Sequence, residues 1–406
     1  MNNNVSAAKL AIALVLLAAA IYFLAQPLIN NINLGLDLQG GAQVVLQAIP
    51  DPGKTVTPDD MTRMTSVMRK RVDEFGISEP VIQREGSDRL IVELAGIEDP
   101  EAAINLLGQT AKLEFRDPDG NVVLSGEELA DAKANTNPKS DGSGFAISLT
   151  FNDEGARKFG EATARLVGQT ISIYLDDKEL TSPRVNEPIM SGGAEMSGGY
   201  KEYKDASNMA AILRGGALPV KIEIMSKQTV GPSLGQDSLQ KSIMASIIGL
   251  IIMALFMLLY YRVPGFLACV SLVLYVFIVF GIMALFRFTL TLPGIAGFVL
   301  SIGMAVDANI IIYERLKEEL RGGKSLPAAI ESGFKRALAT ILDSNITTLI
   351  ASLVLIYFGT GSIKGFGITL TIGLITNLLT AITFSRYLLR WTSEIGPLGS
   401  KKLFGL

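Results

Sequence analysis

The sequence predicts an α-helical membrane protein with six transmembrane helices and one exported α+β domain built from two similar halves. Of its 406 residues, 49% are hydrophobic and only 18% are charged, and the mean hydropathy is +0.38. A soluble core of this length needs fewer apolar residues, so part of the chain is expected in lipid. Six apolar stretches, and one long polar region in which the same order of strands and helices occurs twice, support this fold class.

Six stretches are long and apolar enough to cross a bilayer, which takes about 20 mostly apolar residues. They are 10–25, 242–261, 263–286, 288–313, 344–363 and 365–386. The first could instead be a cleavable signal peptide. No small-x-small cleavage site precedes the break at Gln26 and Pro27, so we interpret it as an uncleaved anchor.

The distribution of basic residues predicts the orientation. Lysine and arginine gather in alternate loops, at Arg262, Arg315, Lys317, Arg321, Lys324, Lys335, Arg336, Arg386, Arg390, Lys401 and Lys402. The other turns hold only Arg287 and Lys364. Because cytoplasmic loops carry the excess of basic residues, both termini are expected in the cytoplasm and the polar region on the outer side.

This orientation divides the chain into four parts. We expect a cytoplasmic N-terminus with the first span at 1–29, an exported domain at 30–241, five further spans at 242–390 and a cytoplasmic tail at 391–406. Apolar residues recur at helical spacing within the inner loop 314–342. We therefore expect an amphipathic helix there, lying on the inner membrane surface.

The exported region shows the order β-α-β-β-α-β twice. The first half is predicted from segments 36–48, 58–75, 81–84, 89–94, 100–107 and 112–116, and the second from 145–151, 154–167, 170–175, 179–185, 206–213 and 219–226. Each half matches a ferredoxin-like unit. Between them, 117–144 is rich in Gly, Asp, Asn, Ser and Lys without a sustained period, which indicates a mobile insert.

Several kinds of chemistry are excluded by composition. The chain has no histidine and one cysteine, Cys269, so Cys/His metal sites and Ser/His or Cys/His nucleophile pairs are absent from it. A net charge of −3 argues against nucleic acid as a partner. Gly-Gly-Lys-Ser at 322–325 resembles the end of a phosphate loop, but Glu318 stands where that loop needs glycine. No cofactor is expected, and an ion gradient is the remaining energy source.

Asp307 is the principal candidate for a functional residue. It interrupts an apolar segment that continues beyond it from Ala308 to Tyr313, and a carboxylate inside a membrane is costly. The alternative is that the helix ends at Asp307 and the acid lies at the water interface. No lysine or arginine occupies the middle of any span, so a partner subunit would have to supply a cation.

A stripe of small residues runs along the same segment. Gly297, Ser301, Ala305 and Asn309 recur every four residues, with Gly303 one turn before the acid. Such a stripe lets another helix approach closely. We therefore expect a partner helix on this stripe.

Other polar residues in the spans could form a path for ions. These are Asn345, Thr347 and Thr348 at the start of the fifth span and Asn377 in the sixth. Ordinary hydrogen bonding between helices explains them equally well. Asp343 and Ser344 are expected to cap the fifth helix.

An ordered series of motifs resembles the SecD/SecF family of the RND superfamily. The motifs are LGLDLQGG at 34–41, RGGALP at 214–219, VGPSLG at 230–235, GMAVDAN at 303–309, SGFKRA at 332–337 and DSNITT at 343–348. The resemblance as a whole extends from the first span to the last. Taken singly, the glycine pairs also have a structural explanation, as a strand entry at Gly40 and Gly41 and a helix C-cap at Gly215 and Gly216.

The resemblance implies a function and a set of partners. It implies a subunit that uses a proton or sodium gradient to complete preprotein translocation across the bacterial cytoplasmic membrane, without enzymatic activity. SecF would be a separate chain, and SecYEG, SecA and YajC would be further partners. Asp307 matches the family's ion-coupling acid. The exported domain matches the family's P1 base, with the inserted head reduced to 117–144.

Two other functions fit part of the same pattern. Half of an RND-type exporter of small molecules or lipids would share the membrane acid, although such exporters usually have two large exported loops. A scaffold without transport activity would not need Asp307.

Overall fold

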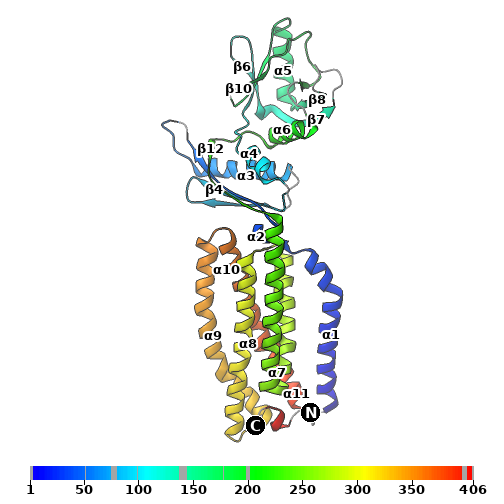
Figure 1. The fold of residues 1–406 in the computed structure, drawn as a ribbon, viewed down its shortest axis with the longest axis vertical. Coiled ribbons are helices and arrows are strands. Elements are labelled where there is room, and N and C mark those ends of the chain that lie inside the picture. The colour runs from blue at the N-terminus through cyan, green and yellow to red at the C-terminus, as the bar shows by residue number, and fades with distance from the viewer. Residues whose placement is uncertain are drawn as a thin grey trace. The chain divides into compact units, whose positions relative to one another are not determined.

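The computed structural model describes residues 3–50, 52–74, 80–97, 99–136, 144–176, 178–197, 202–395 and 400–404. The chain divides into two compact units. One comprises Met1–Gly40 with Gly231–Leu406 and holds the long helices, and the other is Gly41–Val230 and holds most of the strands (Figure 1).

The helical unit is built mainly from long apolar helices. Its elements are α1 Asn3–Asn30, β1 Asn33–Leu34, α2 Leu36–Gln39, α7 Pro232–Leu285, β13 Thr289–Leu290, α8 Leu292–Arg321, α9 Leu326–Phe358, α10 Gly361–Leu379, η2 Thr380–Ser385, α11 Arg386–Ser393 and η3 Lys401–Phe404. Five helices among the described residues could cross a membrane by length and composition: α1, α7, α8, α9 and the run from α10 through α11.

The longest of these helices, α7, folds back on itself. Arg262 has φ 55° and ψ −116°, which breaks the helix. A Cβ placed on Gly265 would lie 1.9 Å from the carbonyl oxygen of Met257. In a straight helix, residues 257 and 265 would instead be about 12 Å apart along the axis, so the chain must reverse direction between them. The two arms of α7, 232–261 and 263–285, correspond to the predicted segments 242–261 and 263–286, and glycine at 265 lets them meet.

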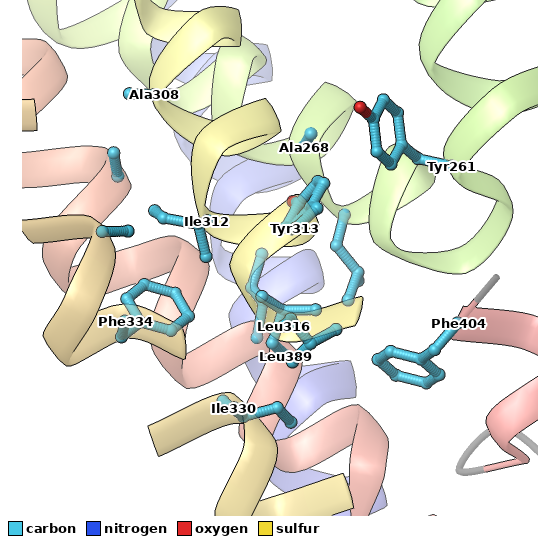
Figure 2. Close-up of a cluster of buried hydrophobic side chains, with 14 of the residues drawn as sticks. Tyr261, Ala268, Ala308, Ile312, Tyr313, Leu316, Ile330, Phe334, Leu389 and Phe404 are labelled. Atoms are coloured by element: carbon cyan, nitrogen blue, oxygen red, sulfur yellow. The ribbon is translucent and has the colours of Figure 1, made fainter. Parts of the chain in front are cut away.

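The helix predicted in the loop 314–342 is present, but it is the first part of α9 instead of a separate surface helix. Helix α8 runs to Arg321, and α9 continues without a break from Leu326 to Phe358. The apolar residues of that segment form the first turns of α9 and are buried against α8, as Ile330 and Phe334 show beside Ile312 and Leu316 (Figure 2). Their helical period therefore reflects a packed helix.

The segment before the domain docks onto the helical unit. Strand β1 pairs in parallel with β13, and Gly35 N–H donates to the Leu290 carbonyl oxygen at 2.8 Å. The Ser362 hydroxyl donates to the Asp37 carboxylate at 2.6 Å. Residues 36–39 form the short helix α2, where a strand was expected. Gly40 and Gly41 then take positive φ, at 79° and 132°, before the strand begins.

The first sheet of unit 41–230 is antiparallel, with the order β12-β2-β4-β3. Its strands and helices are β2 Gly41–Ile49, α3 Pro58–Glu74, β3 Val81–Glu85, β4 Arg89–Ala95, α4 Pro100–Leu107 and β12 Lys221–Val230. Buried methionines of α3 at 61, 64 and 68 pack on the sheet at helical spacing. The order βαββαβ is the one predicted for the first half, but its last strand is β12 instead of 112–116.

The remaining part of this unit, 108–220, does not form the predicted second βαββαβ sheet. Its elements are β5 Leu113–Arg116, β6 Val122–Ser125, η1 Gly126–Glu128, β7 Leu129–Thr136, β8 Phe145–Phe151, α5 Asp153–Arg165, β9 Ser172–Leu175, β10 Lys178–Thr181, β11 Gly193–Ser197 and α6 Tyr203–Gly215. They form two sheets, β10-β9-β5-β6 and β11-β8-β7. The expected loop 117–144 contains β6 and β7, and its residues 137–143 lie outside the described part of the chain.

One buried arginine holds both connections between these two parts. The Arg71 side chain of α3 is fully buried and donates to the carbonyl oxygens of Leu107 (3.3 Å), Thr110 (3.1 Å) and Gly216 (2.9 Å), and to that of Gln109. Burial lowers the pKa of Arg71 to about 10, so it stays charged at neutral pH. The entering and leaving segments also bond directly, because the Leu218 N–H donates to the Thr110 oxygen at 2.9 Å.

Gly215 and Gly216 lie beside Arg71, where the segment 108–220 leads back to the first sheet. A Cβ on Gly215 would lie 2.5 Å from Cγ of Arg71, and Gly216 caps α6 with φ 86°. The predicted C-cap is therefore confirmed, and Gly215 also gives Arg71 its space.

We predict that Arg71→Ala destabilises unit 41–230 by about 3 kcal/mol, because several buried carbonyl oxygens lose their donor. Hydrogen exchange of the full-length protein in detergent at increasing urea measures this loss, and peptides containing Leu218 should exchange fastest. Arg69→Ala is the matched control, since Arg69 is exposed on the same helix. Equal protection in the two variants would contradict the role given to Arg71.

Candidate functional site

Asp307 lies in the middle of α8. The helix begins at Thr291, whose hydroxyl accepts from the Gly294 N–H at 3.1 Å, and it continues for 30 residues to Arg321. Asp307 is therefore about 22 Å from the first helical residue at 1.5 Å per residue. The alternative that the helix ends at the acid is wrong.

The carboxylate lies on the exposed side of α8, next to α9. Asp307 is exposed, and it lines a small pocket of about 50 Å³. The other lining residues are Met304, Ala308 and Ile311 of α8 and Ile341, Ser344 and Asn345 of α9. A cavity of this volume has room for water. Among the described residues, no hydrogen bond or ion pair involves the Asp307 side chain.

The small-residue stripe faces the opposite way and is already covered by the same chain. A Cβ on Gly297 would lie 3.0 Å from Thr369 Oγ1 of α10, and one on Gly373 would lie 2.4 Å from Ser301 Oγ. The Ser301 hydroxyl also lies 2.6 Å from the Tyr275 hydroxyl of α7. The expectation that a partner helix packs on this stripe is therefore wrong, because α10 occupies it.

Two of the predicted polar residues lie where α8 and α10 meet, Asn309 on α8 and Asn377 on α10. The Asn309 amide donates to the Ala305 oxygen at 2.9 Å and accepts from the Ser385 hydroxyl of the π-helical turn η2 at 2.8 Å. The Asn377 amide donates to the Met304 oxygen at 3.4 Å, and its buried Oδ1 has no partner among the described residues. Because residues two apart on a helix face different sides, Asn309 points away from Asp307.

The predicted residues of α9 are divided in the same way. Asn345 is buried, donates to the Ile341 oxygen at 2.7 Å and shares the pocket with Asp307. Thr347 and Thr348 bond back to the carbonyl oxygens of residues 343 and 344 of their own helix, at 3.1 Å and 3.3 Å. On α8, Gly303 lies one turn before the acid, and a Cβ placed on it would meet no atom within 4 Å.

The predicted helix cap at Asp343 and Ser344 is wrong, because both lie in the interior of α9. Ser344 lines the pocket instead, a role that sequence reasoning missed. The signal was available, since no glycine or proline separates Phe334 from Phe358 and the apolar period continues through this stretch. No group of three or more His, Cys, Asp or Glu side chains in the described part of the chain could hold a metal ion.

The long apolar helices, with a carboxylate in the middle of one of them, define a multi-pass membrane protein. Four family models match the chain. They are the SecD/SecF GG motif (30–48), the N-terminal part of the SecDF P1 domain (61–120), the SecDF P1 head subdomain (109–220) and the C-terminal region of the protein export membrane proteins SecD/SecF (213–394).

Whole-chain relatives agree with these models. The protein translocase subunit SecD of Acidaminococcus fermentans is 50% identical over 383 residues, which cover 94% of this chain and 91% of the relative. SecD of Sebaldella termitidis is 45% identical, with 93% of each chain covered. The chain belongs to the SecD/SecF family, as a SecD-type translocase subunit.

A solved structure has the same fold. The crystal structure of SecDF from Thermus thermophilus, a translocon-associated membrane protein, superposes with a TM-score of 0.64 at 34% identity. The match covers 97% of this chain but only 59% of the SecDF chain. The matched head subdomain, 109–220, is much longer than the 117–144 to which we expected it to be reduced, and it coincides with the part that Arg71 connects to the first sheet.

We predict that Gly373→Val lowers the melting temperature of the detergent-solubilised protein by roughly 5 °C or more, because overpacking a tight helix contact costs about 1–3 kcal/mol. Gly303→Val is the control: it adds the same side chain to open space on α8, so its melting temperature should stay near that of the unchanged protein. The assigned packing would be wrong if the two variants melted together.

Proposed function

We propose that this subunit couples ion movement through Asp307 to the late pulling of preproteins across the bacterial cytoplasmic membrane. The observation that carries the proposal is the position of Asp307, halfway along an apolar helix, on an exposed side and next to a pocket with room for water. A carboxylate there is costly in lipid, by about 2.5–3.5 kcal/mol on insertion scales and more by other estimates. Such a residue is retained for a function.

The topology we propose has six spans with both termini in the cytoplasm. Counting the two arms of α7 separately gives six, and the shorter arm, 263–285, is about 34 Å long, enough to cross a hydrocarbon core of about 30 Å. The alternating basic loops support this orientation. Unit 41–230 is then the exported P1 domain, with a ferredoxin-like base around the first sheet and the head at 109–220.

We propose that SecF, as a separate chain, covers the exposed side of α8. Leu300 is 51% exposed there, next to Gly303 and Asp307, and Ile350 of α9 is 60% exposed. This surface would shield the acid from lipid and could supply a cation or a water path. SecYEG, SecA and YajC are further partners in this proposal, and the preprotein is its substrate.

The energy available from the gradient is sufficient for this coupling. One elementary charge crossing 100 mV yields about 2.3 kcal/mol. Repeated ion steps can therefore bias a conformational change of a few kcal/mol. We propose that movement passes through the residues that precede the domain, because β1 and α2 are held by β13 and by Ser362 at the start of α10.

We predict that Asp307→Asn abolishes the stimulation of preprotein transport by an imposed gradient while leaving the protein inserted. Asparagine keeps the size of the side chain but cannot change charge, so the ion cycle stops. Proteoliposomes with the translocon, with and without a proton or sodium gradient, measure the effect. Asp343→Asn is the matched control on α9 and should keep most of the stimulation. Full stimulation in the Asp307 variant would refute the coupling role.

We also predict which side of α8 the partner contacts. A photoreactive benzoylphenylalanine at Leu300 should form adducts with a co-expressed SecF chain. The same residue at Phe298, which is 8% exposed and packs on Phe280, should form adducts only within its own chain. Adducts to SecF from position 298, or none from 300 when the chains purify together, would place the partner elsewhere.

A further inference from the structure

An apolar cavity of about 680 Å³ separates part of α1 from the two arms of α7. Its wall includes Ile21, Ala25 and Ile29 from α1 and Ala254, Cys269 and Phe280 from α7. Every residue that lines it is aliphatic or aromatic, apart from the Cys269 thiol. Water needs two to four polar partners to occupy a buried site, so this cavity favours a hydrocarbon over water.

Helix α1 packs against its neighbours toward its N-terminal end. There Leu10 packs against the hydrophobic cluster between the helices, and Leu17 is 8% exposed. The Ser6 hydroxyl donates to Glu394 beyond α11, at 2.5 Å. Helix α1 therefore contacts the other helices along its first half and stands away from them along its second half, the half that leads to unit 41–230.

The length of the cavity identifies the kind of molecule that fits. On α7 it extends from Cys269 to Phe280, which is about 17 Å at 1.5 Å per residue. This is close to the hydrocarbon depth of a single leaflet, about half of 30 Å. A helix of a partner protein would have to cross the full 30 Å, and the contacts of Leu10 and Leu17 close its path.

We propose that an acyl chain of a membrane phospholipid occupies this cavity as a bound lipid. The chain fills the space between α1 and α7 that protein side chains leave open. Because the wall has no charged or hydrogen-bonding side chain other than the thiol, the site selects for an acyl chain and its length. The site is separate from the pocket beside Asp307, and its occupation does not depend on ion coupling.

The test uses the full-length protein in vesicles of phosphatidylethanolamine and phosphatidylglycerol with a trace of phospholipid carrying a diazirine in the middle of one acyl chain. After irradiation, mass spectrometry of peptides should place adducts on 21–29 and 269–280 at several times the yield found on freely exposed positions outside the cavity, such as Val15 and Leu16. Uniform labelling of all lipid-facing residues would overturn the proposal.

Two variants distinguish a filled site from general lipid contact. Ala25→Phe combined with Ala254→Phe fills the cavity and should reduce adducts on 269–280 at least five-fold. Ala18→Phe adds the same side chain to an exposed position of α1 outside the cavity and should leave the yield unchanged. An equal loss in both proteins, or no loss in the double variant, would contradict a specific site.

Two readouts do not depend on these variants. In native mass spectrometry, the unchanged protein released from detergent should retain one phospholipid per chain.

Cys269 is the single cysteine, so its reaction with a water-soluble maleimide reports directly on the cavity. Slow labelling that becomes at least ten-fold faster after delipidation supports an acyl chain in place. Fast labelling in vesicles would show a water-filled cavity, and adducts between Cys269 and a partner protein would show that a protein occupies it.

Discussion

The close contact between α8 and α10 is the constraint on which the membrane site depends. Residues without bulky side chains make it possible: a Cβ on Gly365 would lie 2.5 Å from Thr291 Oγ1, and one on Gly373 would lie 2.4 Å from Ser301 Oγ. In a membrane, packing and buried hydrogen bonds hold helices together, since lipid is as apolar as the side chains. Because this contact fixes the rotation of α8, Asp307 must face the other side.

The sequence alone identified Asp307 as a candidate, but it did not show which residues surround its side chain. A carboxylate within an apolar segment stands out because of its cost, whatever the fold. A stripe of small residues predicts that some helix comes close, but it does not say which one, and here α10 of the same chain takes the place assigned to a partner. The cap assigned to Asp343 and Ser344 failed for a related reason: short polar residues suit both helix ends and helix interiors, and here Ser344 lines the pocket beside Asp307.

In unit 41–230 the sequence predicted most strands but not their partners. Alternation of apolar and polar residues marks a strand by local pattern, whereas pairing depends on contacts far apart in the chain. Residues 221–230 pair with β2 over the length of that strand, and β5 pairs with β9 and β6 in another sheet. A repeated order of elements therefore suggested two equal halves where the chain has one sheet interrupted by a separate subdomain.

The junction at Arg71 has a consequence for how such a protein can vary. The carbonyl oxygens of Thr110 and Gly216 both accept from the same guanidinium nitrogen, so they lie at most about 6 Å apart, a gap that two residues of extended chain can bridge. The head thus begins and ends at one point on the base, like an insertion at a surface loop. A gene could lengthen, shorten or exchange this segment in a single event without breaking the sheet that β2 and β12 form. The same point is a place where an unrelated domain could be grafted.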